Sequence, residues 1–365
     1  MKLYLIAGEA SGDLHGSNLI KALLQQAPYT QCRCWGGDLM QAAGGELVKH
    51  YRDLAFMGFV EVVKNLRTIA RNLSFCKKDI LAFKPDALVL IDYPGFNLRI
   101  AKWAHKKGIK VIYYISPQIW AWHSSRVHDI KKHVDKMLVI LPFEQAFYEK
   151  YGMQTTYVGH PLLDALQTQQ SDNETIKPGK PVIALLPGSR KQEVQRILPI
   201  MLSVISDFPD YEFVIAGASA LPTSYYQPFL AQHPNIRLEH GQTYSLLRQA
   251  TAALVKSGTS TLETALIGTP QVVCYTGSPV SYAIARRVIN VKYISLVNLI
   301  MDAPLVQELI QAELNTSNLK SALYNILVPE KAQELKAGYE ALRHKLGDGG
   351  ASKKAAEAIL SRHTV

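Results

Sequence analysis

Short runs of apolar, largely β-branched residues alternate along the chain with longer segments in which apolar residues recur every three or four positions. The first pattern predicts buried strands and the second predicts amphipathic helices. The clearest strands are expected at 3–7, 87–91, 111–115, 137–140, 182–186, 212–216, 253–256 and 271–275. Because strands that alternate with helices form parallel sheets with right-handed crossovers, the pattern predicts an α/β protein.

The two halves of the chain open in the same way, with a strand, a glycine-bearing loop and then a helix. The 365 residues exceed what one hydrophobic core usually supports. A polar segment rich in turn-forming residues lies between the halves, at 165–180. We therefore expect two Rossmann-like domains that face a cleft, the first spanning 1–164 and the second spanning 165–345.

The tail of the sequence, from residue 331 onward, predicts two helices that are broken at the glycine-rich segment 347–350. Leu335, Tyr339 and Leu342 recur at helical spacing in the first of these helices. We expect the last helix, 346–365, to complete the N-terminal domain.

Composition favours a folded globular protein. With 48% hydrophobic and 19% charged residues, the chain resembles neither a disordered nor a multi-span membrane protein, and no apolar stretch approaches the ~20 residues that span a bilayer. The opening residues predict a strand and not a signal peptide, because the apolar run is short and Glu9 comes early. The four cysteines are too few for a disulfide framework and match no zinc spacing, so we expect a reducing cytosol.

The net charge of +10 comes mainly from the N-terminal half. Such a surplus attracts nucleic acid, anionic lipid or a phosphorylated substrate, and charge alone does not choose among them. A soluble protein that is simply basic is the plain alternative.

A loop with the sequence Pro-Gly-Ser-Arg, residues 187–190, leaves one strand and enters a helix expected at 192–204. Free backbone N–H groups and the positive end of the helix favour a bound anion there, and Arg190 adds a bidentate donor. We therefore interpret Gly188, Ser189 and Arg190 as phosphate-binding residues. A surface arginine beside a tight turn is the alternative.

A similar loop, formed by Ser257, Gly258 and Thr259, follows the strand 253–256. Its small side chains let phosphate oxygens approach the backbone, and Glu263, one turn into the helix, is placed to pair with ribose hydroxyls. A capping box formed by Thr259 and Glu263 explains the same residues without a ligand. Two such loops in one domain favour a nucleoside diphosphate.

The first loop of the chain, 8–16, is acidic and opens a helix expected at 14–26. It lacks the G-x-G-x-x-G pattern, and its Glu9 and Asp13 would repel a pyrophosphate. These two acids are better suited to sugar hydroxyls or to orienting a neighbour. Alternatively, Asp13 is an ordinary helix N-cap and Glu9 is a loop acid.

Asp92 ends the fully apolar strand 87–91. A carboxylate at a strand terminus, flanked by an apolar wall, can be held in place and tuned as a general base. A loop aspartate satisfied by local hydrogen bonds beside Tyr93 and Pro94 is the alternative.

Residues 56–73 predict a basic amphipathic helix, with an apolar stripe from Phe59 to Leu73 and with Lys64, Arg67 and Arg71 on the other side. Such a helix lies at a membrane surface, walls a lipid pocket, or packs on a sheet. The aromatic run at 119–122, Ile-Trp-Ala-Trp, is equally compatible with a core and with the wall of an acceptor site.

Taken in order, the motifs of this chain resemble those of the lipid-A-disaccharide synthase family over nearly the whole sequence. They are AGEASGD at 7–13, MGFVEV at 57–62, IDYPGFN at 91–97, SPQIWAW at 116–122, LPFE at 141–144, GHP at 159–161, LLPGSR at 185–190, SGT at 257–259 with Glu263, and SLVNL at 295–299. Two positions depart from the family, which often has a second acid at Gly95 and usually has proline at Val297.

The resemblance implies a glycosyltransferase-B fold and a UDP-sugar-dependent hexosyltransferase of lipid A (lipopolysaccharide) biosynthesis in Gram-negative bacteria. The implied substrates are UDP-2,3-diacylglucosamine and 2,3-diacylglucosamine 1-phosphate, which are joined by an inverting transfer through a β(1→6) bond with release of UDP. We expect no metal or other cofactor, because fixed cations and dipoles neutralise the diphosphate, and no nucleic-acid partner. A UDP-N-acetylglucosamine 2-epimerase of the same fold is the alternative.

The resemblance further implies a peripheral enzyme on the cytoplasmic face of the inner membrane, and a homodimer of a family whose members often exchange C-terminal domains; whether this dimer does so stays open. By matching positions, Asp92 is the candidate base, Arg190 the phosphate-side arginine and Asn298 the donor-side asparagine. We add Glu9 as a further catalytic candidate whose role stays open.

Overall fold

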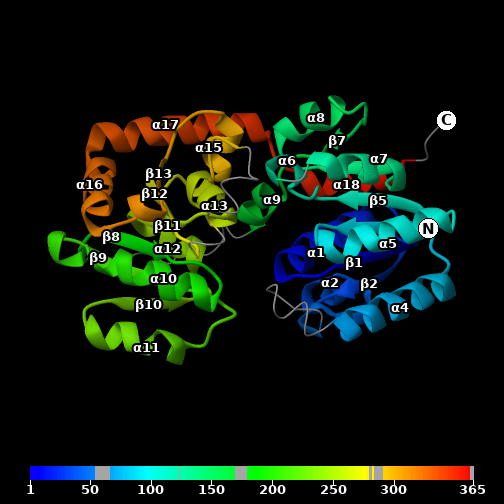
Figure 1. Ribbon diagram of the computed structural model, residues 1–365, viewed down its shortest axis with the longest axis horizontal. Coiled ribbons are helices and arrows are strands. Elements are labelled where there is room, and N and C mark those ends of the chain that lie inside the picture. The colour runs from blue at the N-terminus through cyan, green and yellow to red at the C-terminus, as the bar shows by residue number, and fades with distance from the viewer. Residues whose placement is uncertain (54–65, 123, 169–178, 279–281, 283–290, 362–365) are drawn as a thin grey trace. The chain divides into compact units, whose positions relative to one another are not determined.

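The computed structural model describes residues 1–53, 66–122, 124–168, 179–278, 282 and 291–361 (Figure 1). The chain forms two compact units, one made of Met1–Asp164 with Asp348–Val365 and the other of Ala165–Gly347. We call them the N-terminal unit and the C-terminal unit. Each is built on its own parallel sheet, so the α/β class expected from the sequence is confirmed.

The sheet of the N-terminal unit has the order β3-β2-β1-β4-β5-β6-β7. Its strands are β1 (Lys2–Ala7), β2 (Gln31–Gly36), β3 (Glu46–His50), β4 (Ala87–Ile91), β5 (Lys110–Tyr114), β6 (Lys136–Val139) and β7 (Thr156–Tyr157). Its helices are α1 (Ala10–Gln26), α2 (Asp38–Ala42), α4 (Leu66–Phe83), α5 (Pro94–Lys106), α6 (Ile119–Trp122), α7 (Val127–His133), α8 (Pro142–Glu149), α9 (Pro161–Thr168, which runs into the second unit) and α18 (Ala351–Leu360).

The sheet of the C-terminal unit has the order β10-β9-β8-β11-β12-β13. Its strands are β8 (Val182–Leu186), β9 (Glu212–Gly217), β10 (Arg237–His240), β11 (Ala250–Lys256), β12 (Gln271–Tyr275) and β13 (Gln307–Ile310). Its helices are α10 (Lys191–Leu202), α11 (Thr223–Gln232), α12 (Thr243–Gln249), α13 (Thr259–Ile267), α15 (Leu296–Met301), α16 (Thr316–Leu327) and α17 (Pro329–Leu346).

The eight strands expected from the sequence are all present, with each end within three residues of its expected position. They form the interior of the two sheets, and β4 and β8 are buried at every residue. A parallel strand covered on both faces needs a continuous apolar run, which is why these strands were visible in the sequence.

Five strands were not expected, and four of them lie at sheet edges. These four are β3, β7, β10 and β13. Most of their residues are partly or fully exposed, so they carry polar side chains that hide the strand pattern. The fifth, β2, contains Arg33, whose guanidinium is paired with Asp79 at 2.7 Å and with Glu46.

Several helix boundaries differ from expectation. Helix α10 spans Lys191–Leu202 and not 192–204, and α4 continues to Phe83, past the expected end at 73. Helix α1 begins at Ala10 and not at residue 14, so Asp13 lies inside the helix and Glu9 is the N-cap residue. The final helix, expected at 346–365, is α18 and begins at Ala351, because Leu346 still belongs to α17 and Gly347, Gly349 and Gly350 have positive φ angles.

The carboxylate of Asp164 anchors α18 in the N-terminal unit. It accepts hydrogen bonds from the backbone N–H groups of Gly350, Ala351 and Ser352 at 2.7, 3.3 and 3.0 Å. Helix α18 packs against α1 and buries Ala355, among other small residues.

Helix α4 contains the described end of the basic amphipathic segment; residues 54–65, and with them the motif at 57–62, lie outside the described residues. Leu73, Cys76 and Ile80 of α4 pack in the core of the unit. Of the expected segment, Leu73 thus packs against the core of the unit, and Cys76 and Ile80 lie beyond its expected end at 73. Among the described residues, no helix is both long and apolar enough to cross a membrane.

Candidate functional site

The chemical loops of both units follow the carboxyl ends of parallel strands. In the N-terminal unit these are the loops after β1, β4 and β5, and in the C-terminal unit those after β8 and β11. Ligands of open α/β sheets bind at this edge, so the sequence motifs lie where the fold places ligand sites.

Asp92 directly follows β4, in a backbone conformation that non-glycine residues rarely adopt. Its φ angle is 44° and that of Tyr93 is 49°. Three hydrogen bonds hold the residue: its N–H donates to the Tyr114 carbonyl at 3.1 Å, and its own carbonyl accepts from Asn97 Nδ2 at 2.8 Å and from the Tyr113 hydroxyl at 2.6 Å. A left-handed backbone conformation costs free energy in any residue other than glycine, and such residues cluster at functional sites.

The environment of the Asp92 carboxylate favours its protonated form. Burial raises its pKa to about 6, and the negative charge of Glu9 adds to the effect. A carboxylate with this pKa is ionised at neutral pH but is a stronger base than an ordinary aspartate. The alternative of a loop aspartate held by local hydrogen bonds is correct for the backbone of Asp92. A hydrogen bond with the Tyr93 backbone also reaches its side chain, but it lowers the pKa less than burial and Glu9 raise it.

The loops after β1 and β4 meet through Gly8 and Tyr93. A Cβ atom on Gly8 would lie 2.3 Å from the Tyr93 ring, so only glycine allows the ring to pack there. Glu9, the next residue, is the N-cap residue of α1 and has an extended backbone conformation. This packing explains why Glu9 is near enough to Asp92 to affect its pKa.

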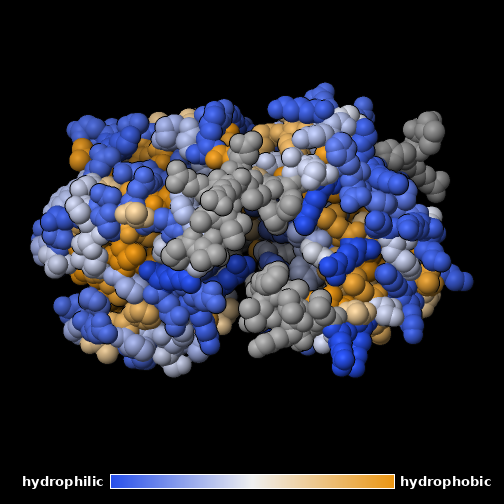
Figure 2. Space-filling view, viewed as in Figure 1, coloured by the Kyte–Doolittle hydropathy of each residue, from blue (hydrophilic) through white to orange (hydrophobic). Residues whose placement is uncertain are grey.

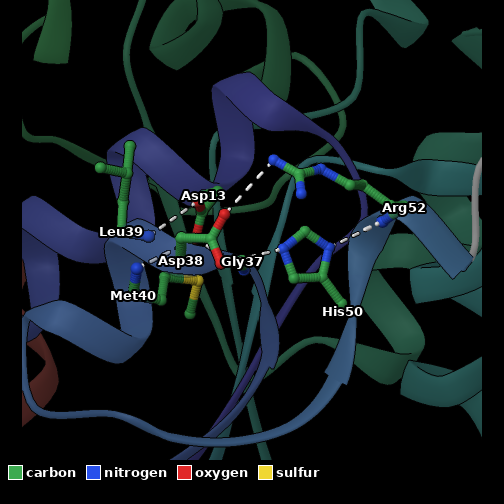
Figure 3. A network of polar contacts seen from close by, with 7 residues as sticks. All are labelled: Asp13, Gly37, Asp38, Leu39, Met40, His50 and Arg52. Carbon is green, nitrogen blue, oxygen red and sulfur yellow. Dashed lines mark hydrogen bonds and ion pairs between the residues drawn. The ribbon is translucent and has the colours of Figure 1, made fainter.

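Asp13 is a capping residue for a different helix. Its carboxylate is buried and accepts hydrogen bonds from the N–H groups of Gly37, Leu39 and Met40 at 2.7, 3.2 and 3.0 Å, at the start of α2 (Figure 3). The alternative that Asp13 caps its own helix is therefore wrong. Of the roles expected for it, orienting a neighbour is the one observed.

The network in Figure 3 continues at the carboxyl end of β3. Asp38 lies 3.5 Å from His50 Nε2 and 3.3 Å from Arg52, and the Arg52 N–H donates to His50 Nδ1 at 3.1 Å. These residues fix the loop that follows β3 beside α2. They were not expected from the sequence, because their spacing matches no motif.

A second buried carboxylate, Glu144, lies under the aromatic run. Its Oε1 accepts from Trp120 Nε1 at 3.2 Å and its Oε2 accepts from the N–H groups of Ile140 and Leu141 at 3.2 and 2.9 Å. Burial raises the pKa of Glu144 to about 7. Trp120 is partly exposed, which fits the wall of an acceptor site better than a hydrophobic core, whereas Ile119 is buried as a core residue is. The sequence motifs contain Glu144 without giving it a role, although its position after a strand and a proline is a signal.

The Pro-Gly-Ser-Arg turn of the C-terminal unit binds a carboxylate of its own chain. Gly188 has a φ angle of +116°, and Arg190 is the N-cap residue of α10. The N–H groups of Ser189 and Arg190, expected to be free, donate to Glu193 Oε2 at 3.1 and 3.3 Å. Glu193 is a candidate site residue that the sequence motifs did not indicate.

The loop 257–259 is tied to the turn 187–190 through a lysine that the motifs also did not indicate. Lys256, the last residue of β11, places its Nζ 2.9 Å from Glu193 Oε1. Ser257 donates through its hydroxyl to the Ile294 carbonyl at 3.0 Å and through its N–H to the Cys274 carbonyl at 2.9 Å. The two candidate phosphate loops are thus neighbours within one unit.

Glu263 and Asn298 both have partners in the structure. Glu263 accepts a hydrogen bond from the Tyr244 hydroxyl at 2.9 Å, and burial raises its pKa. Because Gly258 is the N-cap residue of α13 and makes no side-chain cap, the capping-box alternative is wrong. Asn298 donates to the Val306 carbonyl at 2.8 Å and to Glu308 at 2.9 Å. Their roles toward a donor stay predictions.

Among the described residues, no group of three or more His, Cys, Asp or Glu side chains is placed to hold a metal ion.

Comparison with known proteins gives one family. A family model described as lipid-A-disaccharide synthetase matches residues 3–361. The lipid-A-disaccharide synthase of Syntrophus aciditrophicus is 41% identical, with 98% of this chain and 96% of that protein covered. Those of Geobacter metallireducens and Coxiella burnetii are 38% and 36% identical, covering 98% and 97% of this chain and 96% of each relative.

Solved structures agree on the fold. A UDP-GlcNAc 2-epimerase from Neisseria meningitidis bound to UDP-GlcNAc superposes with a TM-score of 0.69 at 15% identity, covering 99% of this chain and 100% of that one. The glycotransferase of kitacinnamycin gives a TM-score of 0.69 at 15% identity, covering 98% of each chain. At such low identity these likenesses show the two-domain fold of glycosyltransferase-B proteins and nothing about substrates.

Proposed function

The chain belongs to the lipid-A-disaccharide synthetase family, and from that premise we propose which of its residues carry the family's reaction. The enzyme is a UDP-sugar-dependent glycosyltransferase. It transfers 2,3-diacylglucosamine from its UDP donor to 2,3-diacylglucosamine 1-phosphate, forming the β(1→6) disaccharide and UDP in lipid A biosynthesis.

Asp92 is the general base of this reaction. It takes the proton from the acceptor 6-hydroxyl as that oxygen attacks the anomeric carbon, and the configuration inverts. The observation that carries the assignment is a partly buried carboxylate on a strained backbone at the end of β4, whose pKa is raised to about 6. Glu9 acts through Asp92, because its charge contributes to that raised pKa.

The leaving UDP is stabilised in the C-terminal unit. Gly188, Ser189 and Arg190 hold the diphosphate from one loop, and Ser257, Gly258 and Thr259 hold it from the other. The ion pair between Lys256 and Glu193 supports this, because it joins the two loops. Glu263 takes the ribose and Asn298 supports the donor side. We accordingly assign the donor to the C-terminal unit and the acceptor to the N-terminal unit.

Peripheral binding at the cytoplasmic face of the inner membrane follows from the substrates, since both carry acyl chains that partition into the bilayer. The exposed side of α4 supports this, because it presents Phe75 and Leu81 together with basic residues. In Figure 2, hydrophobic and strongly hydrophilic residues lie side by side on the part of the N-terminal unit where Figure 1 places α4 and α5. A homodimer, with or without exchanged C-terminal domains, is a further proposal from the family.

The test is a transfer assay with the full-length protein, labelled UDP-diacylglucosamine and the lipid acceptor in mixed micelles. We expect a disaccharide 1-phosphate and an equal amount of UDP, both dependent on the acceptor. Asp92→Asn should lose on the order of 10²-fold or more in turnover while UDP binding is retained. Asp86→Asn, at the opposite end of β4, is the matched control and should stay active.

Near-normal turnover in Asp92→Asn would remove Asp92 from the mechanism. Conversion of the UDP-sugar without acceptor would instead favour an epimerase, as the Neisseria meningitidis protein of the same fold is.

A further inference from the structure

A carboxylate of the chain itself occupies the turn assigned to phosphate. Glu193 Oε2 accepts from the N–H groups of Ser189 and Arg190 at 3.1 and 3.3 Å. Glu193 Oε1 lies 2.9 Å from Lys256 Nζ and 4.0 Å from the Arg190 guanidinium. Two amides, an ammonium and a guanidinium therefore converge on one carboxylate, the same donor types that bind a phosphate group.

The backbone is shaped for this contact. A Cβ atom on Gly188 would lie 2.5 Å from Glu193 Oε2, so glycine is what lets the carboxylate reach the turn. Lys256 extends from the other loop, and its Nζ lies 3.7 Å from the position that a Cβ on Gly258 would take. The ammonium group thus lies against both loops.

Glu193 is charged while it occupies the turn. Burial pushes the pKa of Glu193 upward, but Lys256, Arg190 and the backbone hydrogen bond outweigh it and lower the pKa, so the group is an anion at neutral pH. Lys256 and Arg190 together carry two positive charges, which match the two negative charges of a sugar-linked diphosphate. While Glu193 remains in place, one of those positive charges is already neutralised.

We infer that Lys256 is a further diphosphate-binding residue and that Glu193 is a built-in placeholder, which the donor diphosphate displaces. On binding, the two amides and Lys256 exchange a carboxylate oxygen for phosphate oxygens, and the Glu193 side chain leaves the turn. The donor must compete with Glu193, so the apparent Kd exceeds the intrinsic Kd by the reciprocal of the fraction of molecules with an open turn. This inference rests on the proposed function, because it takes the ligand to be a nucleoside diphosphate.

The experiment is calorimetric titration of the full-length protein with UDP. Glu193→Gln keeps the side-chain length and one acceptor oxygen for the amides but removes the charge, and we expect UDP to bind roughly threefold to tenfold more tightly. Lys256→Ala should weaken UDP binding about tenfold or more, since a charge-assisted hydrogen bond is lost. Lys191→Ala is the matched control: Lys191 begins the same helix, but its Nζ lies over the Tyr225 ring at 5.8 Å, so UDP binding should not change.

A purely structural cap makes the opposite prediction, namely that Glu193→Gln binds UDP as the parent does or more weakly. That result, or an unchanged Kd in Lys256→Ala, overturns the inference. Thermal melting of each variant confirms that it is folded, and Glu193→Asp, which keeps the charge but shortens its reach, should show the tighter binding as well. If the parent protein fails to bind UDP, the proposed function fails; if the parent binds and the variants do not shift, only this inference fails.

Discussion

At the residue scale, Asp92 shows how far the fold departs from what an isolated aspartate prefers. Its backbone is held in a left-handed conformation by hydrogen bonds to Tyr113, Tyr114 and Asn97. Its carboxylate is desolvated beside another acid, Glu9. Both conditions cost stability, and a protein retains such costs where they support function.

The raised pKa of Asp92 predicts the acid side of the pH profile. A general base works only when ionised, so kcat/KM should be constant above about pH 6 and should fall about tenfold per pH unit below it. Burial is the larger cause and Glu9 the next, so Glu9→Gln removes a neighbouring charge and should move this limb to lower pH.

The measurement is kcat/KM against pH for the parent, Glu9→Gln and Glu46→Gln. Glu46 is an exposed carboxylate of the same unit, paired with Arg33, and neutralising it should leave the limb in place. A limb that stays fixed in Glu9→Gln would show that Glu9 does not tune Asp92.

At the element scale, the sequence was informative where burial is complete and uninformative where it is partial. Interior strands such as β4 and β8 need continuous apolar runs and were predicted. Edge strands such as β3 and β10 need none, because much of their surface faces water, and they were missed. The apolar pattern therefore predicted the interior of the two sheets but not the strands at their edges.

The candidate site follows the same rule. Motif spacing indicated Asp92 and Arg190 as candidates, since it depends on position along the chain. It missed Lys256 and Glu193, which come together only because β11 lies beside β8 in the sheet. The sequence allowed Asp13 to orient a neighbour but did not identify which one, because its three partners lie 24 to 27 residues away in sequence, at the start of α2.

The anchoring of α18 is a testable property of one element. The N-cap residue of α18 is Gly350, which has no side chain, so Asp164 supplies the cap from 186 to 188 residues away. Asp164→Ala leaves three N–H groups without this acceptor and should lower the free energy of unfolding by about 2–3 kcal/mol. Hydrogen exchange in α18 should accelerate more than in the rest of the unit.

Asp348→Ala is the control for this prediction, because Asp348 belongs to the same connecting segment and none of the three N–H groups donates to it. If Asp164→Ala and Asp348→Ala melt alike, Asp164 does not hold the helix in place.

At the scale of the whole molecule, part of the positive charge of the chain lies on one face of a helix. The exposed residues of α4 recur three or four positions apart and so share one face; they include Arg67, Arg71 and Lys78. Asp79, the acid of this helix, is turned to Arg33 and Tyr4. The exposed face of α4 is therefore basic, with Phe75 and Leu81 as its apolar residues, 47% and 48% exposed.

Such a face predicts binding to anionic vesicles. The full-length protein should float with phosphatidylcholine vesicles that contain phosphatidylglycerol and not with phosphatidylcholine alone, because each basic residue near an anionic surface contributes about 1 kcal/mol. Raising the salt from about 0.1 M to about 1 M shortens the screening length from about 10 Å to about 3 Å and should release the protein.

The double variant Phe75→Ser with Leu81→Ser should weaken binding about tenfold at low salt, since two apolar side chains no longer enter the interface. Val328→Ser changes a residue of the other unit that is 45% exposed and should have no effect. Equal flotation of all three proteins would place the membrane-binding surface elsewhere than on α4.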